Sequence, residues 1–455
     1  MRTAREQAAL RRAPHARQGR SRPLAGWRAG ARASLADPEH RRPGPGPSRP
    51  AAHSLAPAPA APAKASPRLP ANQVLLSAVV AVLTVVGLVM VLSASSVEAL
   101  SQYGSSWVFF DHQVMWVAMG TVLLVVVSRV DYRVWRRLSG PLLVGVVVLL
   151  LAVLVPGLGS RVGGSSRWLG FGSLRFQPSE LAKLALAVFG ADVLARRAGP
   201  DRRWWPAVRP VLIAFAVTGL LILRQPDMGT ALVLGCITLG LLYAAGAPGR
   251  VMGGVLAGGG MAAFVVGIAQ PYRRARLLSF LNPWDHRTNT GYQLIQSLVG
   301  FANGHVLGVG LGASRAKWGF LPNAHTDFIF SIIGEELGLV GSLLVVALFV
   351  ALAIVGLRVA GRAPDRFGSL LAAAITCWLT AQAVLNMGAV IGLLPVTGVP
   401  LPFVSYGGSS LAIEMAAVGV MLNIARRGRA RPEEGAGGLR GAAKVQRARP
   451  PARGR

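Results

Sequence analysis

The amino-acid sequence predicts an all-α polytopic membrane protein with about ten transmembrane helices, a long outer loop between helices 7 and 8, and disordered basic tails. Of its 455 residues, 52% are hydrophobic and only 15% are charged. The mean hydropathy is +0.48, which is unusual for a water-soluble domain of this length. Much of the formal net charge of +30 lies outside the apolar part of the chain. The body therefore belongs in a bilayer.

The two ends of the chain are basic and poor in large apolar residues. Residues 1–70 are rich in Arg, Ala and Pro, and residues 427–455 are rich in Arg and Gly. Such segments cannot bury a core, so both are expected to be disordered tails around one membrane domain, residues 71–426. Their charge suits an anionic membrane surface or an acidic partner, and it does not require nucleic acid.

Apolar segments long enough to cross a bilayer recur along the body. They are expected near residues 72–95, 107–128, 141–158, 177–196, 207–224, 228–246, 250–270, 326–357, 367–394 and 404–425. An even number of spans places both termini on one side. The loops on that side carry many arginines, as cytoplasmic loops do. We therefore expect a multi-pass protein of the cytoplasmic membrane with both termini in the cytoplasm.

Two outer segments break this rule on positive charge. The loop between the third and fourth spans and the long loop at 270–326 carry, among others, Arg161, Arg167, Arg175, Arg273, Arg274 and Arg315. Guanidinium groups bind phosphate oxygens in pairs, so a bound anion would explain them. Attraction to anionic lipid headgroups is the simpler explanation for any single arginine. As a set, they favour an anionic ligand.

The segment QPSELAK at 177–183 places an acid and a base inside an apolar helix. Proline opens the helix, and the i, i+3 spacing puts Glu180 and Lys183 on one face. The two could form a buried structural ion pair. Alternatively, Lys183 could contact a pyrophosphate, with Glu180 holding it in place. Both interpretations stay open.

A second break, RQPDMGT at 224–230, lies at the outer turn between the fifth and sixth spans. Asp227 is expected to cap the following helix, because an aspartate there satisfies free backbone amides. It could also position a cation or Arg224.

The strongest local signal is LPNAHTDFIF at 321–330, followed by GEELG at 334–338. Asp327 enters an apolar helix from the outer loop, close to His325 and the outer arginines. A carboxylate at such a boundary can accept a proton from a sugar hydroxyl. The alternative is an ordinary N-cap on the eighth span. The two acids of GEELG are expected to anchor packing.

Prolines and glycines interrupt the chain between the last two spans, from Gly392 to Ser410. They indicate a non-helical re-entrant stretch, which a membrane protein tolerates only where protein or a wet cavity receives its backbone. The amides of Gly407 and Gly408 at the next helix start could hold an anion. Ser405 is grouped with them as a candidate substrate-binding residue.

In order and spacing, these motifs resemble the shape, elongation, division and sporulation (SEDS) family over residues 72–426. The further matches are GGSSRWL at 163–169, GYQLIQS at 291–297, GVGLG at 308–312 and LPFVSYGGSS at 401–410. The sequence from Gly312 to Lys317, GASRAK, is more similar to the division branch than to the elongation branch. The resemblance implies ten helices and an outer-face glycosyltransferase that polymerises lipid II, with a class B penicillin-binding protein as partner and other division proteins possible.

The resemblance also assigns residues. The family's essential aspartate matches Asp327, and its other functional positions match Glu180, Lys183 and Asp227. This implies that Asp327 deprotonates the GlcNAc 4-hydroxyl, which displaces undecaprenyl pyrophosphate with inversion at the MurNAc anomeric carbon. The leaving pyrophosphate would meet Lys183 and some of the candidate arginines (Arg167, Arg273, Arg274 and Arg315), with a divalent cation such as Mg²⁺ or Mn²⁺ as an optional addition.

This sequence departs from the family at two positions, and two other functions stay open. His305 stands where the family often has Gly, and Asn323 where Glu is frequent. A carrier that moves lipid II across the bilayer would also have intramembrane charges and broken helices. However, the sequence shows no matching halves. A non-enzymatic scaffold that recruits a transpeptidase at the septum is the third possibility.

Overall fold

The computed structural model describes residues 71–162, 165–171, 174–199, 204–269, 274–275, 279–288 and 291–428. The expected tail at 1–70, nearly all of the tail at 427–455, and Arg273 lie outside these residues.

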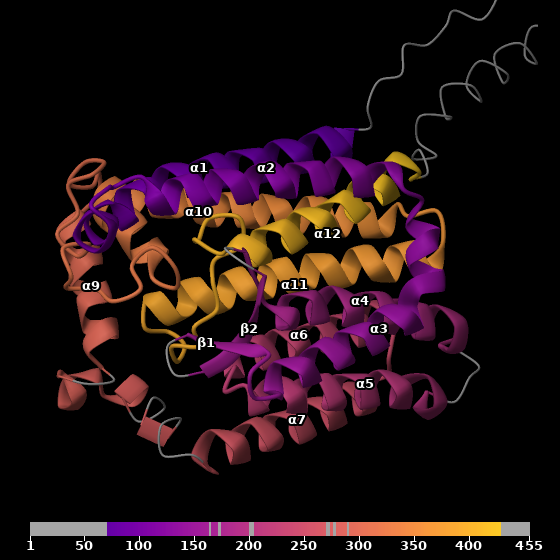
Figure 1. The fold of residues 1–455 in the computed structure, drawn as a ribbon. Coiled ribbons are helices and arrows are strands. Elements are labelled where there is room, and N and C mark those ends of the chain that lie inside the picture. Colours follow the sequence, from indigo (N-terminus) through magenta and orange to yellow (C-terminus); the bar gives the residue numbers. More distant parts are fainter. Residues whose placement is uncertain are drawn as a thin grey trace, which may run out of the picture. The chain divides into compact units, whose positions relative to one another are not determined.

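Each of the ten expected spans coincides with a helix (Figure 1). These helices are α1 (Ala71–Tyr103), α2 (Val108–Arg129), α3 (Tyr132–Leu154), α4 (Pro178–Arg197), α5 (Trp205–Arg224), α6 (Met228–Ala244), α7 (Gly249–Ala269), α10 (Ile329–Gly361), α11 (Arg366–Val390) and α12 (Gly408–Arg426). Among the described residues, eight helices are long and apolar enough to cross a membrane, and α6 is a shorter apolar helix. Helix α4 differs because Glu180, Lys183 and Asp192 interrupt its apolar stretch. The expectation of a polytopic helical membrane protein is confirmed.

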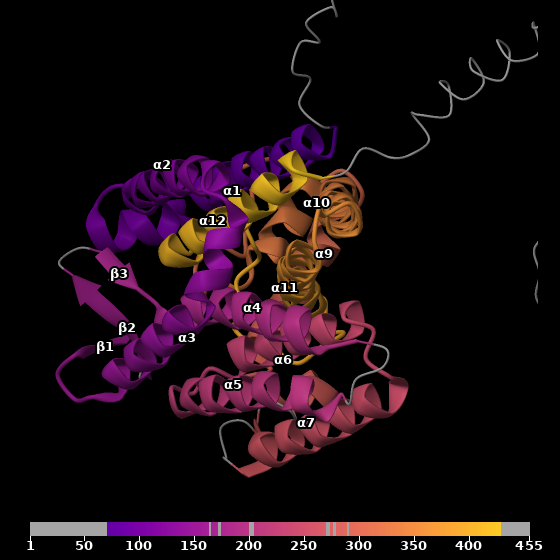
Figure 2. The same cartoon turned by 90° about the vertical axis from the view of Figure 1, so that its right-hand side faces the viewer.

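Helices α11 and α12 form the centre of the bundle. In α12, 89% of the most apolar stretch is buried, and in α11 72% is buried, whereas the values are 17% in α2 and 6% in α7. Helix α4 is also almost wholly buried and packs against α3, α6 and α11. Figure 2 shows α4 and α11 between the outer helices. The charged helix α4 is therefore shielded by its neighbours, and the apolar faces of α2 and α7 suit a lipid environment.

A small antiparallel sheet, which the sequence did not predict, joins α3 to α4. It consists of β1 (Gly159–Val162), β2 (Ser165–Phe171) and β3 (Leu174–Phe176) in the order β1-β2-β3. Leu169 pairs with Gly159 on one side and with Phe176 on the other. Figure 1 shows this sheet, α9 and the α11–α12 connection at one end of the bundle, which we call the sheet end. Helix α1 begins and α12 ends at the opposite end.

The long loop before α10 contains a 3-10 helix, η1 (Pro283–His286), and a further helix, α9 (Tyr292–Gly304). Helix α9 packs against the bundle, where the Ser297 hydroxyl donates to the Val390 carbonyl at 2.7 Å. The loop thus returns to the bundle before the chain enters α10.

Helix α10 is interrupted at Gly338, where φ is +68°. The loop after α9 occupies the break: Val309 N–H donates to Glu335 O at 3.0 Å, and Leu339 N–H donates to His305 O at 3.0 Å. A side chain at position 338 would place Cβ 2.4 Å from Gly308 N. Glycine is therefore needed here both for the left-handed backbone and for the close approach.

Candidate active site

The connection between α11 and α12, residues 391–407, is non-helical, as the sequence predicted. Residues 401–405 are buried, so their backbone groups need partners inside the protein. Side-chain amides provide them. Gln113 Nε2 donates to Ser405 O at 3.3 Å, and Gln382 Nε2 donates to Pro400 O at 3.0 Å. The segment is therefore built into the bundle at the sheet end.

Asp327 lies against this connection. The carbonyl of Asp327 accepts a 2.7 Å hydrogen bond from Asn386 Nδ2, which also donates to Val399 O at 2.8 Å. Asp327 is partly exposed. Gly398, with φ +72°, lies beside it, because a Cβ there would be 3.5 Å from Asp327 Oδ2. The carboxylate thus faces the connection, where glycine leaves room next to it.

Whether Asp327 caps α10 stays a prediction. The N-cap residue is Phe328, whose side chain makes no capping hydrogen bond. The turn before it depends on Asn323, whose φ is +58° and whose carbonyl accepts the N–H groups of Thr326 and Phe328 at 3.2 and 3.3 Å. Asparagine tolerates this left-handed conformation. Asp327 is therefore placed by a turn and by α11.

Contacts of His325 and Ser405 hold the two residues that precede Asp327. His325 Nδ1 lies 3.2 Å from Glu98 Oε2, and its carbonyl accepts the Tyr406 N–H at 3.0 Å. The Ser405 hydroxyl donates to Thr326 O at 2.6 Å and accepts the Leu401 N–H at 2.8 Å. The Ser405 side chain and the His325 carbonyl thus fasten the Asp327 turn to the connection, while the His325 side chain lies against α1. Their predicted contact with substrate stays a prediction.

Glu180 and Lys183 form a buried ion pair of 2.6 Å between Lys183 Nζ and Glu180 Oε2. Lys183 is 1% exposed, and its Nζ also donates to Gln382 Oε1 at 2.8 Å. This is the structural ion pair that the sequence offered as one interpretation. The other interpretation, a pyrophosphate contact, stays a prediction, because Lys183 faces the core in this conformation.

A second buried carboxylate, Glu414 on α12, belongs to the same network and was not among the expected residues. Glu414 Oε1 accepts from Gln382 at 2.9 Å and from Ser410 at 3.1 Å, while Oε2 accepts the Phe403 N–H at 3.1 Å. Ser410 also donates to Glu180 at 2.8 Å. An acid inside an apolar span is a functional candidate by position alone, and that signal was present in the sequence.

Helix α11 connects this network to Asp327. Gln382 and Asn386 are four residues apart, so they share one helical face. Gln382 binds Lys183 and the carbonyl of Pro400, while Asn386 binds the carbonyls of Val399 and Asp327. Neither amide was expected, although two amides at this spacing in an apolar helix are a usable signal. They make the position of Asp327 depend on α11.

Asp227 caps α6, as the sequence predicted. Its carboxylate accepts the Thr230 N–H at 3.0 Å and the Thr230 hydroxyl at 2.8 Å. Gln177 Nε2 donates to Asp227 Oδ2 at 3.3 Å, which connects the starts of α4 and α6. A role in substrate binding stays a prediction.

The candidate arginines occupy different positions at the sheet end. Arg167 on β2 donates to Gln225 O at 2.8 Å and to Pro226 O at 2.6 Å, so it fastens the sheet to the turn before α6. Arg274 and Arg315 are exposed. Arg167 is partly exposed. Whether any of the three contacts substrate stays a prediction.

The acids of GEELG anchor the outer loop, as expected. Glu335 accepts the N–H groups of Arg315 and Ala316 at 3.1 and 3.2 Å. Glu336 accepts the Ser93 hydroxyl at 2.6 Å and lies 3.6 Å from Lys317 Nζ. Together they fasten the loop to α10 and α1.

The remaining candidates concern anions and metals. Gly407 is the N-cap residue of α12, and both Gly407 and Gly408 are partly exposed. Anion binding there stays a prediction. In the part of the chain that the structure describes, no three His, Cys, Asp or Glu side chains group to hold a metal ion. Binding of a divalent cation stays a prediction.

The helical bundle, its buried charge network and the aspartate beside a re-entrant connection define a multi-pass membrane protein with a polar site at one end. The chain belongs to the FtsW, RodA and SpoVE family of cell cycle proteins, because the family model matches residues 73–430. A relative from Geobacter metallireducens, named probable peptidoglycan glycosyltransferase FtsW, is 43% identical over 351 residues, which cover 77% of this chain and 93% of the relative.

Solved structures agree with this assignment. One solved structure is described as the structural coordination of polymerization and crosslinking by a peptidoglycan synthase complex. One of its chains matches this protein with a TM-score of 0.64 and 29% identity, covering 77% of this chain and 96% of that chain. The rod shape determining protein RodA of Thermus thermophilus matches with a TM-score of 0.59 and 27% identity, covering 78% of this chain and 97% of that chain. The family resemblance seen in the sequence is confirmed.

Proposed function

We propose that this protein is a peptidoglycan glycosyltransferase that polymerises lipid II on the outer face of the cytoplasmic membrane during cell division. The family membership and the glycosyltransferase name of its relative support the activity. The observation that carries the proposal is the placement of Asp327, whose carboxylate faces Gly398 while Asn386 holds its backbone. A carboxylate fixed by its main chain can meet a sugar hydroxyl in a constant geometry.

In the proposed reaction, Asp327 removes the proton from the GlcNAc 4-hydroxyl of one lipid II. The hydroxyl oxygen forms a bond to the MurNAc anomeric carbon of the growing strand. The bond from that carbon to the pyrophosphate oxygen breaks on the opposite face, so the configuration inverts. Undecaprenyl pyrophosphate leaves with the bonding electrons, and the proton passes from Asp327 to water.

Negative charge develops on the leaving pyrophosphate, and cations at the sheet end would stabilise it. Arg167, Arg274 and Arg315 are partly or fully exposed there and are our candidates. For Lys183 to take part directly, its Nζ must leave Glu180 and Gln382. In the conformation described here, Lys183 instead holds α4 against α11.

The proposed orientation places the sheet end outside the cell and both termini in the cytoplasm. Arginines at the ends of α2, α4 and α10, such as Arg129, Arg197 and Arg358, lie at the end of the bundle where α1 begins and α12 ends, in agreement with the positive-inside rule. Lipid II then meets Asp327 on the side where the wall is built. Localisation to the septum is part of the same proposal.

A crosslinking transpeptidase of the class B penicillin-binding proteins is the proposed partner. A structural neighbour is described as a complex that coordinates polymerization and crosslinking, which supports a similar pairing here. Nothing in the proposal requires nucleic acid.

The function is tested with the purified full-length chain and lipid II, alone and together with the transpeptidase from the same source. We expect glycan strands on a gel, and none from Asp327→Asn, with lipid II still bound by both. Asp111→Asn is the matched control, because Asp111 is an exposed acid at the start of α2. If no strands form but lipid II crosses vesicle membranes, the protein is a carrier. If neither activity appears, it is a scaffold.

A further inference from the structure

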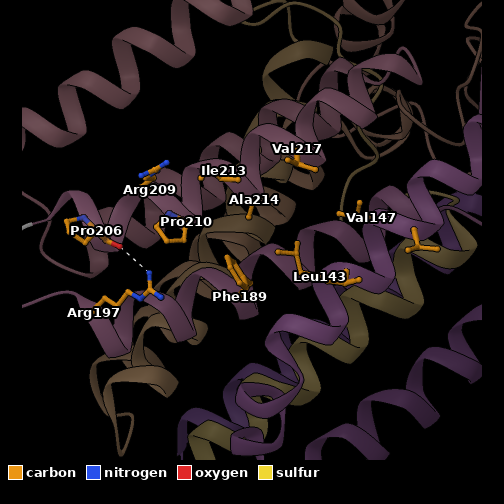
Figure 3. Close-up of a pocket in the computed structure, with 12 residues that line it drawn as sticks. Leu143, Val147, Phe189, Arg197, Pro206, Arg209, Pro210, Ile213, Ala214 and Val217 are labelled. Atoms are coloured by element: carbon orange, nitrogen blue, oxygen red, sulfur yellow. Dashed lines mark hydrogen bonds between the residues drawn. The ribbon is translucent and has the colours of Figure 1, made fainter.

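An apolar cavity of about 670 Å³ lies between α3, α4 and α5 (Figure 3). Its walls include Leu143 and Val147 of α3, Phe189 of α4, and Ala214 and Val217 of α5. The volume is typical of small-molecule sites. In a membrane protein, such a cavity fits hydrocarbon.

Two arginines make one end of this cavity cationic. Arg197, at the end of α4, and Arg209, near the start of α5, lie together at one end, while Val147 and Val217 lie at the other (Figure 3). Arg197 donates to the Pro206 carbonyl at 3.4 Å. In the described ranges, neither arginine forms an ion pair.

Among the described residues, the acid nearest to Arg197 in sequence does not neutralise this charge. Asp192, five residues before Arg197 on α4, already pairs with Arg136 at 3.0 Å and with Arg196 at 2.7 Å. The guanidinium groups at the cavity end can therefore accept an anion from outside the protein, and their planar forks suit a phosphate.

The cavity has the depth of one membrane leaflet. Arg209 and Val217 are eight residues apart on α5, which corresponds to about 12 Å of helix. Half of the hydrocarbon core is roughly 15 Å thick. Trp204 and Trp205 stand just before Arg209, and Trp205 is 61% exposed, as is usual for residues at the membrane interface. The arginines thus lie at headgroup level with the cavity reaching toward the midplane.

We propose that this cavity binds an anionic diacyl phospholipid, with its phosphate on Arg197 and Arg209 and an acyl chain between α3 and α5. A charged headgroup accounts for the arginines and a chain of leaflet length accounts for the apolar walls. Since these arginines lie at the end of the bundle opposite Asp327, this site goes beyond the proposed polymerase function.

The test uses the delipidated full-length protein and two lipids, dioleoyl phosphatidylglycerol and dioleoyl phosphatidylcholine. Native mass spectrometry measures how strongly the protein retains each lipid. We expect a preference for phosphatidylglycerol. Each arginine near a membrane surface adds about fivefold to the attraction of an anionic lipid, so Arg197→Gln with Arg209→Gln should weaken retention about 25-fold. Arg250→Gln, an exposed arginine at the same end on α7, should leave it unchanged.

A second variant tests the apolar part of the site. Val217→Trp adds bulk at an exposed residue of the cavity wall and should reduce retention of both lipids, while an unchanged thermal midpoint confirms folding. The proposal is overturned if the double arginine variant keeps the preference or if Arg250→Gln loses as much. It is also overturned if the unchanged protein retains both lipids equally, which would leave the cavity to an uncharged occupant such as a partner helix.

Discussion

Asn386 provides the sharpest prediction about how the proposed base is positioned. Its amide is 2% exposed and donates to the carbonyls of Asp327 and Val399 at 2.7 and 2.8 Å. Replacing it by leucine keeps the volume and removes both donors. Each buried carbonyl left without a partner costs about 1–3 kcal/mol. The Asp327 turn should therefore shift to find new partners.

A shift of about 1 Å at a reacting group can cost roughly a hundredfold in rate. We expect Asn386→Leu to lower kcat for lipid II polymerisation by about that factor, with KM little changed, and to lower the thermal midpoint by several degrees.

The control is Thr380→Val on the same helix, since the Thr380 hydroxyl is buried without a hydrogen-bond partner. The kcat, the KM and the thermal midpoint of Thr380→Val should equal those of the unchanged protein. A folded Asn386→Leu protein that polymerises at the full rate would refute the reasoning, because Asp327 would then be positioned by other contacts.

Three further predictions concern stability. Lys183→Met leaves Glu180 as a buried carboxylate without its cation. It should lower the free energy of unfolding, measured in detergent, by about 3–5 kcal/mol. Adding Glu180→Gln to this variant should recover part of the loss. Gly338→Ala forces a side chain onto a left-handed backbone in a crowded position, so it should lower stability by about 1–3 kcal/mol and increase hydrogen exchange in α9. The pKa of Asp131 lies below its ordinary value because its carboxylate accepts the backbone N–H of Arg133. The contribution of the Asp131 charge to stability should be complete above about pH 5 and should decline as the pH falls through this lowered pKa. Asp131→Asn should therefore lower the thermal midpoint more at pH 7 than at pH 3.

Each of these predictions has a clear contrary result. Equal stability of Lys183→Met and the unchanged protein would mean that the network does not hold α4. Unaltered exchange in α9 after Gly338→Ala would mean that the break in α10 is not specific to glycine. An equal effect of Asp131→Asn at both pH values would show that the charge of Asp131 is not what matters.

The helices could be predicted from the sequence because apolar length alone decides which segments enter a bilayer. Helix α4 was found in spite of its charges, since an apolar run at 184–191 remains between Lys183 and Asp192. The sheet was not predicted, because β1 and β3 have only four and three residues and no usable alternation. Helix α9 was missed because its 13 residues are too few for a span of about 20 residues, and because it lies in an arginine-rich loop.

The site was predicted in part, for equally physical reasons. Asp327 and Asp227 stand out because few acids lie near membrane depth. Asn386 and Gln382 are uncharged, and their partners are backbone carbonyls that only the folded connection brings near. Arg167 was expected to face a ligand, yet two of its bonds go to carbonyls of a turn 58 and 59 residues away. Contacts of this kind depend on tertiary structure and leave no mark in the local sequence.

The most direct test of the central claim is a rate comparison of the unchanged protein, Asp327→Asn and Asp111→Asn in lipid II polymerisation at matched lipid II occupancy. Loss of the general base should lower kcat by about 10²–10⁴-fold in Asp327→Asn alone, with the dissociation constant for lipid II unchanged. Equal rates for all three proteins would contradict the assignment of Asp327 as the base.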